Sequence, residues 1–316
     1  MQTFQSRFHQ EFFQLRDKHV RALTWLLLSP DVLDERASIW NRQITHLSLP
    51  ERSNLKRWLF DLDAHPTVLH ESLHLHDALR LGHYAENLLA FYFQHEGLLF
   101  GKGVQVFDRA SHTIGEFDYL LFGSNGLIHL ELATKFYLFH RSGHVRHQDS
   151  LFDYLGPNLN DNLGSKIQKI LQKQLSLSQH EAAQRLIPQG IVAAKALIKG
   201  WLFYRSTERE VRSVDGIASD HCMGFWWAES EFQKLAVPYG MVLERLDWLA
   251  PAQAEQDQVM DRDLTMDTLH RHFQIEKRPV MIAIMKRNGD LMQEFCRGFV
   301  VPDLWPLQAS QLHRTS

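Results

Sequence analysis

Residues 115–138, GEFDYLLFGSNGLIHLELATKFYL, are the stretch that decides how this chain is interpreted. Two runs rich in apolar, aromatic and β-branched side chains flank the turn GSNG at 123–126. A short loop of this composition between two such runs is a strong signal for a β-hairpin. We therefore expect two antiparallel strands, at about 113–122 and 127–138.

The turn leaves two registers open. If residues 124–125 form the loop, Asp118 faces Glu131; if residues 125–126 form it, Asp118 faces Ala133. The parity is the same in both registers, since side chains alternate along a strand. We therefore expect the two acids on one face of the hairpin.

These carboxylates need a positive partner, because like charges at directly opposed positions destabilise a sheet. Lys135 is expected on the same face, and a divalent cation between Asp118 and Glu131 would also relieve the repulsion. Apolar side chains on both faces indicate a covered sheet, which places the acids in a cleft. The alternative is a set of surface ion pairs with Lys135 and Arg141, worth about 0–1 kcal/mol.

The composition is that of an ordinary globular chain. Its 316 residues are 44% hydrophobic and 22% charged, which is enough for a sizeable core. The net charge of -3 provides no general attraction to nucleic acid, so binding to phosphates needs a local basic patch.

The N-terminal sequence MQTFQSRFHQ lacks the basic and apolar segments of a signal peptide. The apolar run at 25–28 is too short to cross a bilayer, which takes about 20 residues. We therefore expect a cytoplasmic protein without a membrane span.

Cysteine and histidine usage gives little sign of a metal centre. Cys222 and Cys296 have no paired spacing, which argues against a disulfide scaffold or a zinc–thiolate site and favours a reducing compartment. His140, His144 and His147 form only a loose group after the hairpin, and we interpret them as solvated surface side chains.

Apolar periodicity places the other elements. Helices are expected at about 4–28, 55–62, 68–79 and 83–95, and from a cap at Asn160 or Asp161 to Gln174. Further strands are expected at about 103–109, 191–198, 201–205, 222–228, 241–249, 280–285 and 299–301, with 250–275 helical or loop-like and a frayed tail after Pro306. This order predicts an α/β or α+β fold with a mixed sheet flanked by helices.

Two helices carry charged residues that bear on the hairpin. Glu86 lies near the start of the helix at 83–95, close to its apolar side. Two explanations are open: Glu86 belongs to a functional site, or it stabilises the helix through a favourable interaction with the helix dipole. Lys166, Lys169 and Lys173 form a basic face on the helix after the hairpin. Such a face is commonly only solvated, but beside an acidic pair it suits a phosphate-bearing ligand.

At these residues the chain resembles the PD-(D/E)XK nuclease-like superfamily, whose core is a helix, a three-strand meander, a helix and a further strand. The matching run is about 80–200. The resemblance maps the acid of the second core strand to Asp118 and the E-x-K strand to Glu131. It maps the helix acid to Glu86 and the following basic helix to the segment with Lys166.

More narrowly, the whole chain resembles a bacterial family of about this length known only as a domain of unknown function. The segments LRDKHVRALTWLLLSPDVL at 15–33 and LELATKFYL at 130–138 carry this resemblance. The chain departs from the superfamily pattern at two positions. Ala133 stands where the superfamily has its lysine, with Lys135 two residues further along the same face, and Phe117 replaces the proline before the acid.

The resemblance implies a restriction-endonuclease-like core at 80–205, in the α/β (α+β) class. An N-terminal helical region at 1–79 would pack on this core. Residues 206–316 would form a β-rich α+β extension of the same sheet.

The resemblance also implies a metal-dependent nuclease that acts on DNA. The implied site is the following: catalytic Asp118, Glu131 and Lys135; Mg²⁺ or Mn²⁺ ligands Glu86, Asp118 and Glu131; backbone-binding Lys166, Lys169 and Lys173. The displaced lysine and the acidic net charge favour an alternative, a catalytically degenerate nuclease-like fold that binds nucleic acid or protein. A serine or cysteine hydrolase lacks support, since the chain has no G-x-S-x-G motif.

Overall fold

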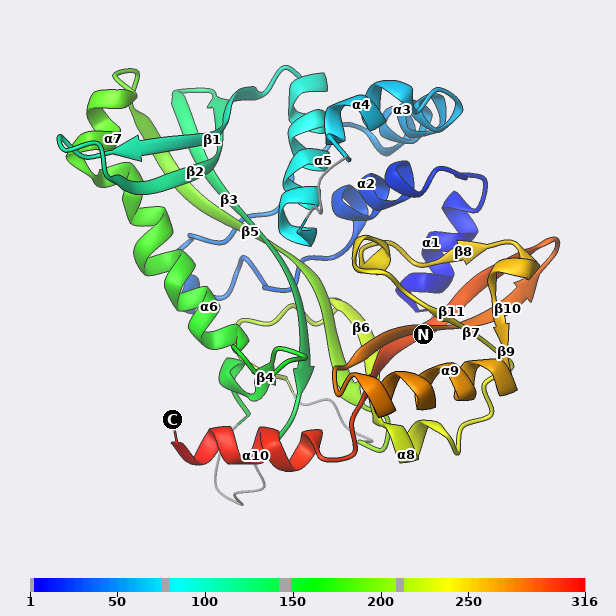
Figure 1. Ribbon diagram of the computed structural model, residues 1–316. Helices are drawn as coiled ribbons and strands as arrows, with labels where there is room; N and C mark the ends of the chain where they lie inside the picture. Colours follow the sequence, from blue (N-terminus) through cyan, green and yellow to red (C-terminus); the bar gives the residue numbers. More distant parts are fainter. Residues whose placement is uncertain (1–2, 76–79, 142–148, 209–212, 316) are drawn as a thin grey trace.

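A mixed sheet runs through the computed structural model, which describes residues 3–75, 80–141, 149–208 and 213–315 (Figure 1). Its strands are β1 Leu99–Phe107, β2 Thr113–Gly123, β3 Gly126–Phe139, β4 Tyr154–Leu155, β5 Ile191–Arg205, β6 Cys222–Ala228, β7 Tyr239–Val242, β8 Gln253–Ala254, β9 Met260–Asp261, β10 Val280–Asn288 and β11 Leu291–Val301. They pair in the order β1-β2-β3-β5-β6-β11-β10-β7-β9, with β4 beside β3 and β8 beside β11. The pairs β3–β5, β5–β6 and β6–β11 are parallel, and the others are antiparallel.

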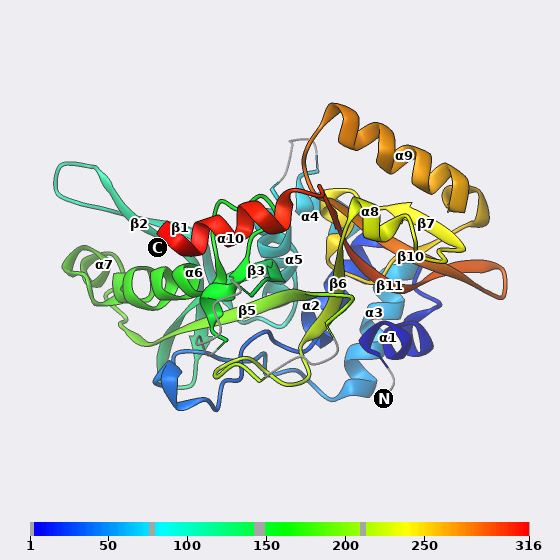
Figure 2. The ribbon, with the colours of Figure 1, turned by 90° about the horizontal axis from the view of Figure 1, so that it is seen from below.

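Helices cover both faces of this sheet, which confirms the expected fold class. The helices are α1 Phe4–Phe12, α2 Lys18–Leu28, α3 Arg52–Ala64, α4 Thr67–Leu73, α5 Leu81–His95, α6 Leu163–Lys169, α7 Glu181–Leu186, α8 Glu229–Phe232, α9 Arg262–Ile275 and α10 Trp305–Thr315. Figure 1 shows α6 on one side of β3 and β5, and α5 with α2 on the other. In Figure 2 the β1–β2 and β10–β11 hairpins extend at opposite ends of the molecule.

Each face of the sheet has its own apolar core. Leu23, Leu88 and Leu130 belong to the cluster under α2 and α5, whereas Ile167 and Ala133 belong to the cluster under α6. Because consecutive side chains of β3 enter different clusters, this strand is buried on both faces, as the apolar character of its sequence predicts.

The single helix expected at 4–28 is wrong, because the chain forms α1 and α2 with a break between them. Asp17 begins α2 by accepting hydrogen bonds from the N–H groups of His19 and Val20. The carboxylate of Asp63, from α3, accepts from the N–H groups of Arg16 and Asp17. A side chain distant in sequence therefore stabilises the break, and the apolar period does not report it.

The two short strands expected at 191–198 and 201–205 are also wrong, since they form one continuous strand, β5. Gly200, which suggested a boundary, lies inside β5 opposite Lys135 of β3. A Cβ at this glycine would lie 1.8 Å from the carbonyl oxygen of Lys135. The glycine therefore permits a close approach of two strands and does not end one.

Three expectations downstream of the hairpin need correction. The cap of α6 is Asn162, whose side chain accepts from the Ser165 N–H, and not Asn160 or Asp161. The strand expected at 241–249 is the short β7 followed by a 3₁₀ turn, η5 Arg245–Trp248. The tail is α10, not a frayed end, because Trp305 is 2% exposed and its indole N–H donates to the Pro157 carbonyl at 2.7 Å.

Candidate active site

The hairpin has the first of the two registers. Tyr119 pairs with Leu130, and Gly123 pairs with Gly126, so residues 124–125 form the loop. One residue beyond the Tyr119–Leu130 pair, the same register places Asp118 opposite Glu131.

β2 and β3 separate just beyond the Tyr119–Leu130 pair. The Asp118 carboxylate fills the gap, where its Oδ2 accepts a hydrogen bond from the Leu132 N–H at 2.9 Å. Side-chain alternation breaks here as well, because Phe117 and Leu120 enter one apolar cluster although they are three residues apart. Asp118 thus lies between the strands, and not on one face of them as the alternation predicts.

Glu131 lies on the face of β3 under η3, a π-helical segment at Ile170–Gln174 that continues α6. It is 1% exposed. Its Oε1 is 2.7 Å from His129 Nε2, and the Gln174 amide donates to its Oε2 at 2.5 Å. Burial lowers the pKa of His129 to about 4, so its imidazole is neutral at physiological pH. The π-helical segment therefore has a specific role, because it brings Gln174 to the buried acid.

The pKa values of both acids are raised. Burial is the largest cause for Asp118, followed by the negative charges of Glu131 and Glu86. Burial is also the largest cause for Glu131, although hydrogen bonding with Asp118 opposes it. The pair therefore favours retention of a proton, and a nearby cation would favour its release.

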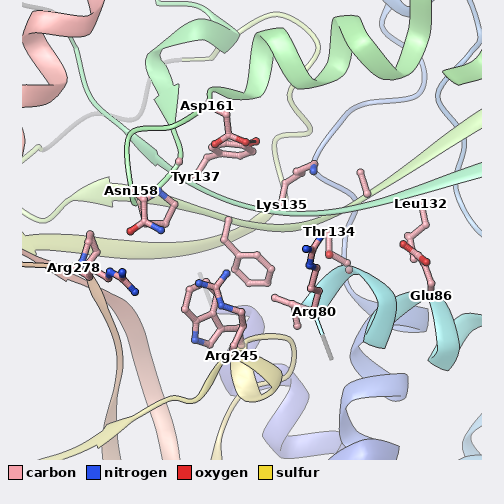
Figure 3. Close-up of a pocket in the computed structure, with 18 residues that line it drawn as sticks. Arg80, Glu86, Leu132, Thr134, Lys135, Tyr137, Asn158, Asp161, Arg245 and Arg278 are labelled. Atoms are coloured by element: carbon pink, nitrogen blue, oxygen red, sulfur yellow. Dashed lines mark hydrogen bonds between the residues drawn. The ribbon is translucent and has the colours of Figure 1, made fainter. Parts of the chain in front are cut away.

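Glu86 lines the cleft from α5, beyond the first turn of that helix, where the helix dipole has little effect (Figure 3). Its Oε2 is 3.1 Å from His83 Nδ1. Its charge contributes to the raised pKa values of Asp118 and Glu131, so the three predicted acids lie in one electrostatic neighbourhood. Lys102, which the sequence analysis missed, belongs to it too: burial lowers its pKa, and the charges of Glu86 and Asp118 oppose this.

Lys135 extends from β3 between Asp161 and Glu86, which also line the cleft (Figure 3). Burial lowers its pKa, and the charge of Lys166 lowers it further. Within the part of the chain that the structure describes, its ammonium group has no hydrogen bond or ion pair. A partly buried lysine of this kind is available to an anionic ligand.

The basic face of α6 and η3 contributes less than expected. Lys166 forms an ion pair with Asp161 at 3.3 Å, and Lys169 is exposed but close enough to lower the pKa of Lys135. Lys173 is exposed on the same segment. None of these three described lysines lines the cleft, which places the predicted backbone-binding residues beside it and not in it.

The cleft has a volume of about 720 Å³ and follows the edge of β3 at 132–137. Its walls are the start of α5, the loop at 156–161, η5 and the segment before β10. Arg80, Arg245 and Arg278 enter it from three of these walls (Figure 3). The sequence analysis missed all three, because they are far apart in the chain and share no local pattern.

The donor chemistry of the acidic pair fits Mg²⁺. This ion takes one or two carboxylates and keeps several waters, and Asp118 and Glu131 supply two carboxylates with raised pKa values. No group of three or more His, Cys, Asp or Glu side chains among the described residues is arranged to hold a metal. Residues 3–75, 80–141, 149–208 and 213–315 therefore contain no preformed metal cage.

The histidine group after the hairpin also differs from expectation. His140 is 9% exposed, its Nε2 is 2.9 Å from the Ser310 hydroxyl, and it packs against Trp226 and Trp305, so it is not a surface side chain. His144 and His147 lie outside the described residues.

The fold and the site define a mixed α/β-sheet protein with an acidic pair beside a cationic cleft. A family model described as "Domain of unknown function (DUF1853)" matches residues 21–301, and the chain belongs to that family. No curated protein and no solved structure is significantly similar to it. Among the described helices, none combines the length and the apolar character needed to cross a membrane.

Proposed function

We propose that this chain is a metal-dependent phosphodiesterase that acts on nucleic acid, with DNA as the substrate. One observation carries the proposal: half-buried Asp118 and buried Glu131 interact beside a cleft whose charged lining is four cations and two carboxylates. Lys102 is a cation of the same neighbourhood, and the excess positive charge of the lining suits a phosphate-bearing substrate.

The order of the elements supports a relation to the PD-(D/E)XK superfamily. Helix α5 carries Glu86, the antiparallel meander β1-β2-β3 carries the other two acids, α6 follows, and β5 then pairs in parallel with β3. This is the order of elements that the sequence resemblance implies for the core. The lysine remains displaced, at Lys135.

Asp118 and Glu131, with Glu86 in support, would hold Mg²⁺ or Mn²⁺, which polarises a phosphodiester and lowers the pKa of bound water. Asp118 is held for this role by the Leu132 N–H. Lys135 would stabilise the negative charge that develops on the phosphate.

A second function is a binding module on the same fold, and a specific contact favours it. Both oxygens of Glu131 already have hydrogen-bond partners, in His129 and Gln174. An acid satisfied in this way has less need of a metal, and the protein would then bind nucleic acid or protein without cleaving it.

Cleavage of plasmid and single-stranded DNA, with Mg²⁺ or Mn²⁺ and with EDTA, tests the two functions. For the Asp118→Ala variant we expect cleavage to fall by at least about 100-fold, the scale for loss of one group that stabilises a transition state. Asp263→Ala, at a side chain that is 97% exposed, is the matched control and should retain wild-type cleavage.

Cleavage that persists unchanged in Asp118→Ala would refute the assigned site. A wild-type protein that neither cleaves DNA nor gives a heat of Mg²⁺ or Mn²⁺ binding in calorimetry would refute the metal-dependent phosphodiesterase and favour the binding module.

A further inference from the structure

Three guanidinium groups lie along one side of the cleft, across from Lys135 and Asp161 (Figure 3). Arg80 precedes α5, Arg245 begins η5, and Arg278 precedes β10. Among the described residues, none of the three side chains has an ion pair or a hydrogen bond. Uncompensated arginines that converge from distant segments are suited to bind phosphate oxygens.

One of these arginines is held in place by an aromatic ring. The guanidinium carbon of Arg245 lies 4.8 Å from the centroid of Trp248, which is itself 9% exposed. Stacking of this kind leaves the N–H groups at the edge of the guanidinium free for another acceptor.

The floor of the cleft is an open strand edge. β2 leaves β3 at Asp118, and β4 joins β3 only at Leu138. The Leu132 N–H points into this gap, so with a strand period of two the main-chain groups of Thr134 and Phe136 point there too. On the edge of β3 that faces away from β5, no described strand pairs with Thr134 or Phe136. Their N–H and C=O groups are therefore directed at the cleft.

The size of the cleft restricts what can enter it. Its volume of about 720 Å³ is in the range of about 300–1,000 Å³ that encloses a small molecule. Nucleotides of one strand fit a space of this size. A duplex keeps its base edges paired, so they are not free to bond to the open edge of β3.

We propose that the cleft binds single-stranded DNA, with its phosphates on Arg80, Arg245 and Arg278 and its unpaired base edges at the open edge of β3. This inference rests on the proposed function and specifies its substrate class. It also assigns backbone binding to the arginines of the cleft, in place of the lysines of α6 and η3.

Fluorescence anisotropy with the full chain in EDTA tests this proposal without cleavage. The probes are a labelled single-stranded oligonucleotide and the same sequence as a blunt duplex, each titrated over a range of salt concentrations. The test variant is Arg80→Ala/Arg245→Ala/Arg278→Ala. The control is Arg36→Ala/Arg57→Ala/Arg271→Ala, which removes the same charge from exposed positions. Circular dichroism and thermal unfolding check that both variants are folded.

We expect the wild-type protein to bind the single strand at least about tenfold more tightly than the duplex, a difference of about 1.4 kcal/mol. The cleft variant should lose roughly tenfold in affinity per arginine, the effect of one charge-assisted hydrogen bond. The plot of log K against log salt should become less steep by about 2, because each of the three lost phosphate contacts contributes about 0.7 to the slope. The control variant should show a smaller change in slope.

Equal affinity for the duplex, or equal losses in the two variants, would overturn the proposal. A folded cleft variant with unchanged affinity would overturn it as well. Tight binding of the single strand without metal-dependent cleavage would support it while refuting the phosphodiesterase function. Metal-dependent cleavage of DNA by a protein that binds duplex more tightly would support the phosphodiesterase function and refute the single-strand proposal.

Discussion

Replacement of Gly200 by alanine should destabilise the sheet where β3 lines the cleft. The added Cβ would lie 1.8 Å from the carbonyl oxygen of Lys135 and 2.8 Å from its carbonyl carbon. These are main-chain atoms of β3, a central strand, so they cannot rotate away as the end of a flexible side chain does. The strands must separate locally, and we expect a loss of at least about 3 kcal/mol in the free energy of unfolding, the upper end for an overpacked core.

Urea denaturation followed by circular dichroism measures this loss. The control is Gly82→Ala in α5, where the added Cβ would meet only Glu86 Oε1, at an ordinary 3.8 Å. Alanine is favoured over glycine in a helix by about 1 kcal/mol, so this variant should be as stable as wild type or more so. If Gly200→Ala unfolds at the wild-type urea concentration, β5 does not approach β3 as closely as argued, and the reason given for a glycine at this position is wrong.

Two further predictions concern buried charges. Because the folded-state pKa of Asp118 is raised, the stability it contributes is present at acid pH and is lost as the pH rises through that pKa. At about pH 9, where the wild-type carboxyl is ionised, the Asp118→Asn variant should therefore unfold at a higher urea concentration than wild type. At about pH 4, where the carboxyl is protonated, this advantage should disappear. An advantage that does not vary with pH would contradict the raised pKa of Asp118. Glu294→Ala removes the carboxylate that bonds the guanidinium of Arg297, which is 0% exposed. Unfolding by urea should show a cost of about 3–5 kcal/mol, whereas the exposed Glu276→Ala should change little; equal stability of the two variants would disprove the importance of this ion pair.

The hairpin was predictable because its signals are local. The turn at 123–126 and the apolar runs beside it define β2 and β3 to within about two residues of the observed ends. The helix α5 follows in the same way from its apolar stripe. In each case the residues that determine the element lie within it or next to it.

The errors arise where a distant part of the chain decides the local structure. Asp63 stabilises the break between α1 and α2 through the N–H groups of Arg16 and Asp17. Gly200 lies in a continuous strand because β3 passes close beside it. Trp305 orders the C-terminal segment by its burial and by its bond to the Pro157 carbonyl.

From its sequence alone, this protein was determined to have an acidic hairpin in a mixed sheet, because turn chemistry and side-chain alternation act over a few residues. Only the tertiary structure decided that β2 leaves β3 at Asp118 and that Gln174 occupies an oxygen of Glu131. It alone brought Arg80, Arg245 and Arg278 to one cleft. The physical reason is that convergence of side chains from separate segments depends on how helices and strands pack, and no short-range pattern encodes that packing.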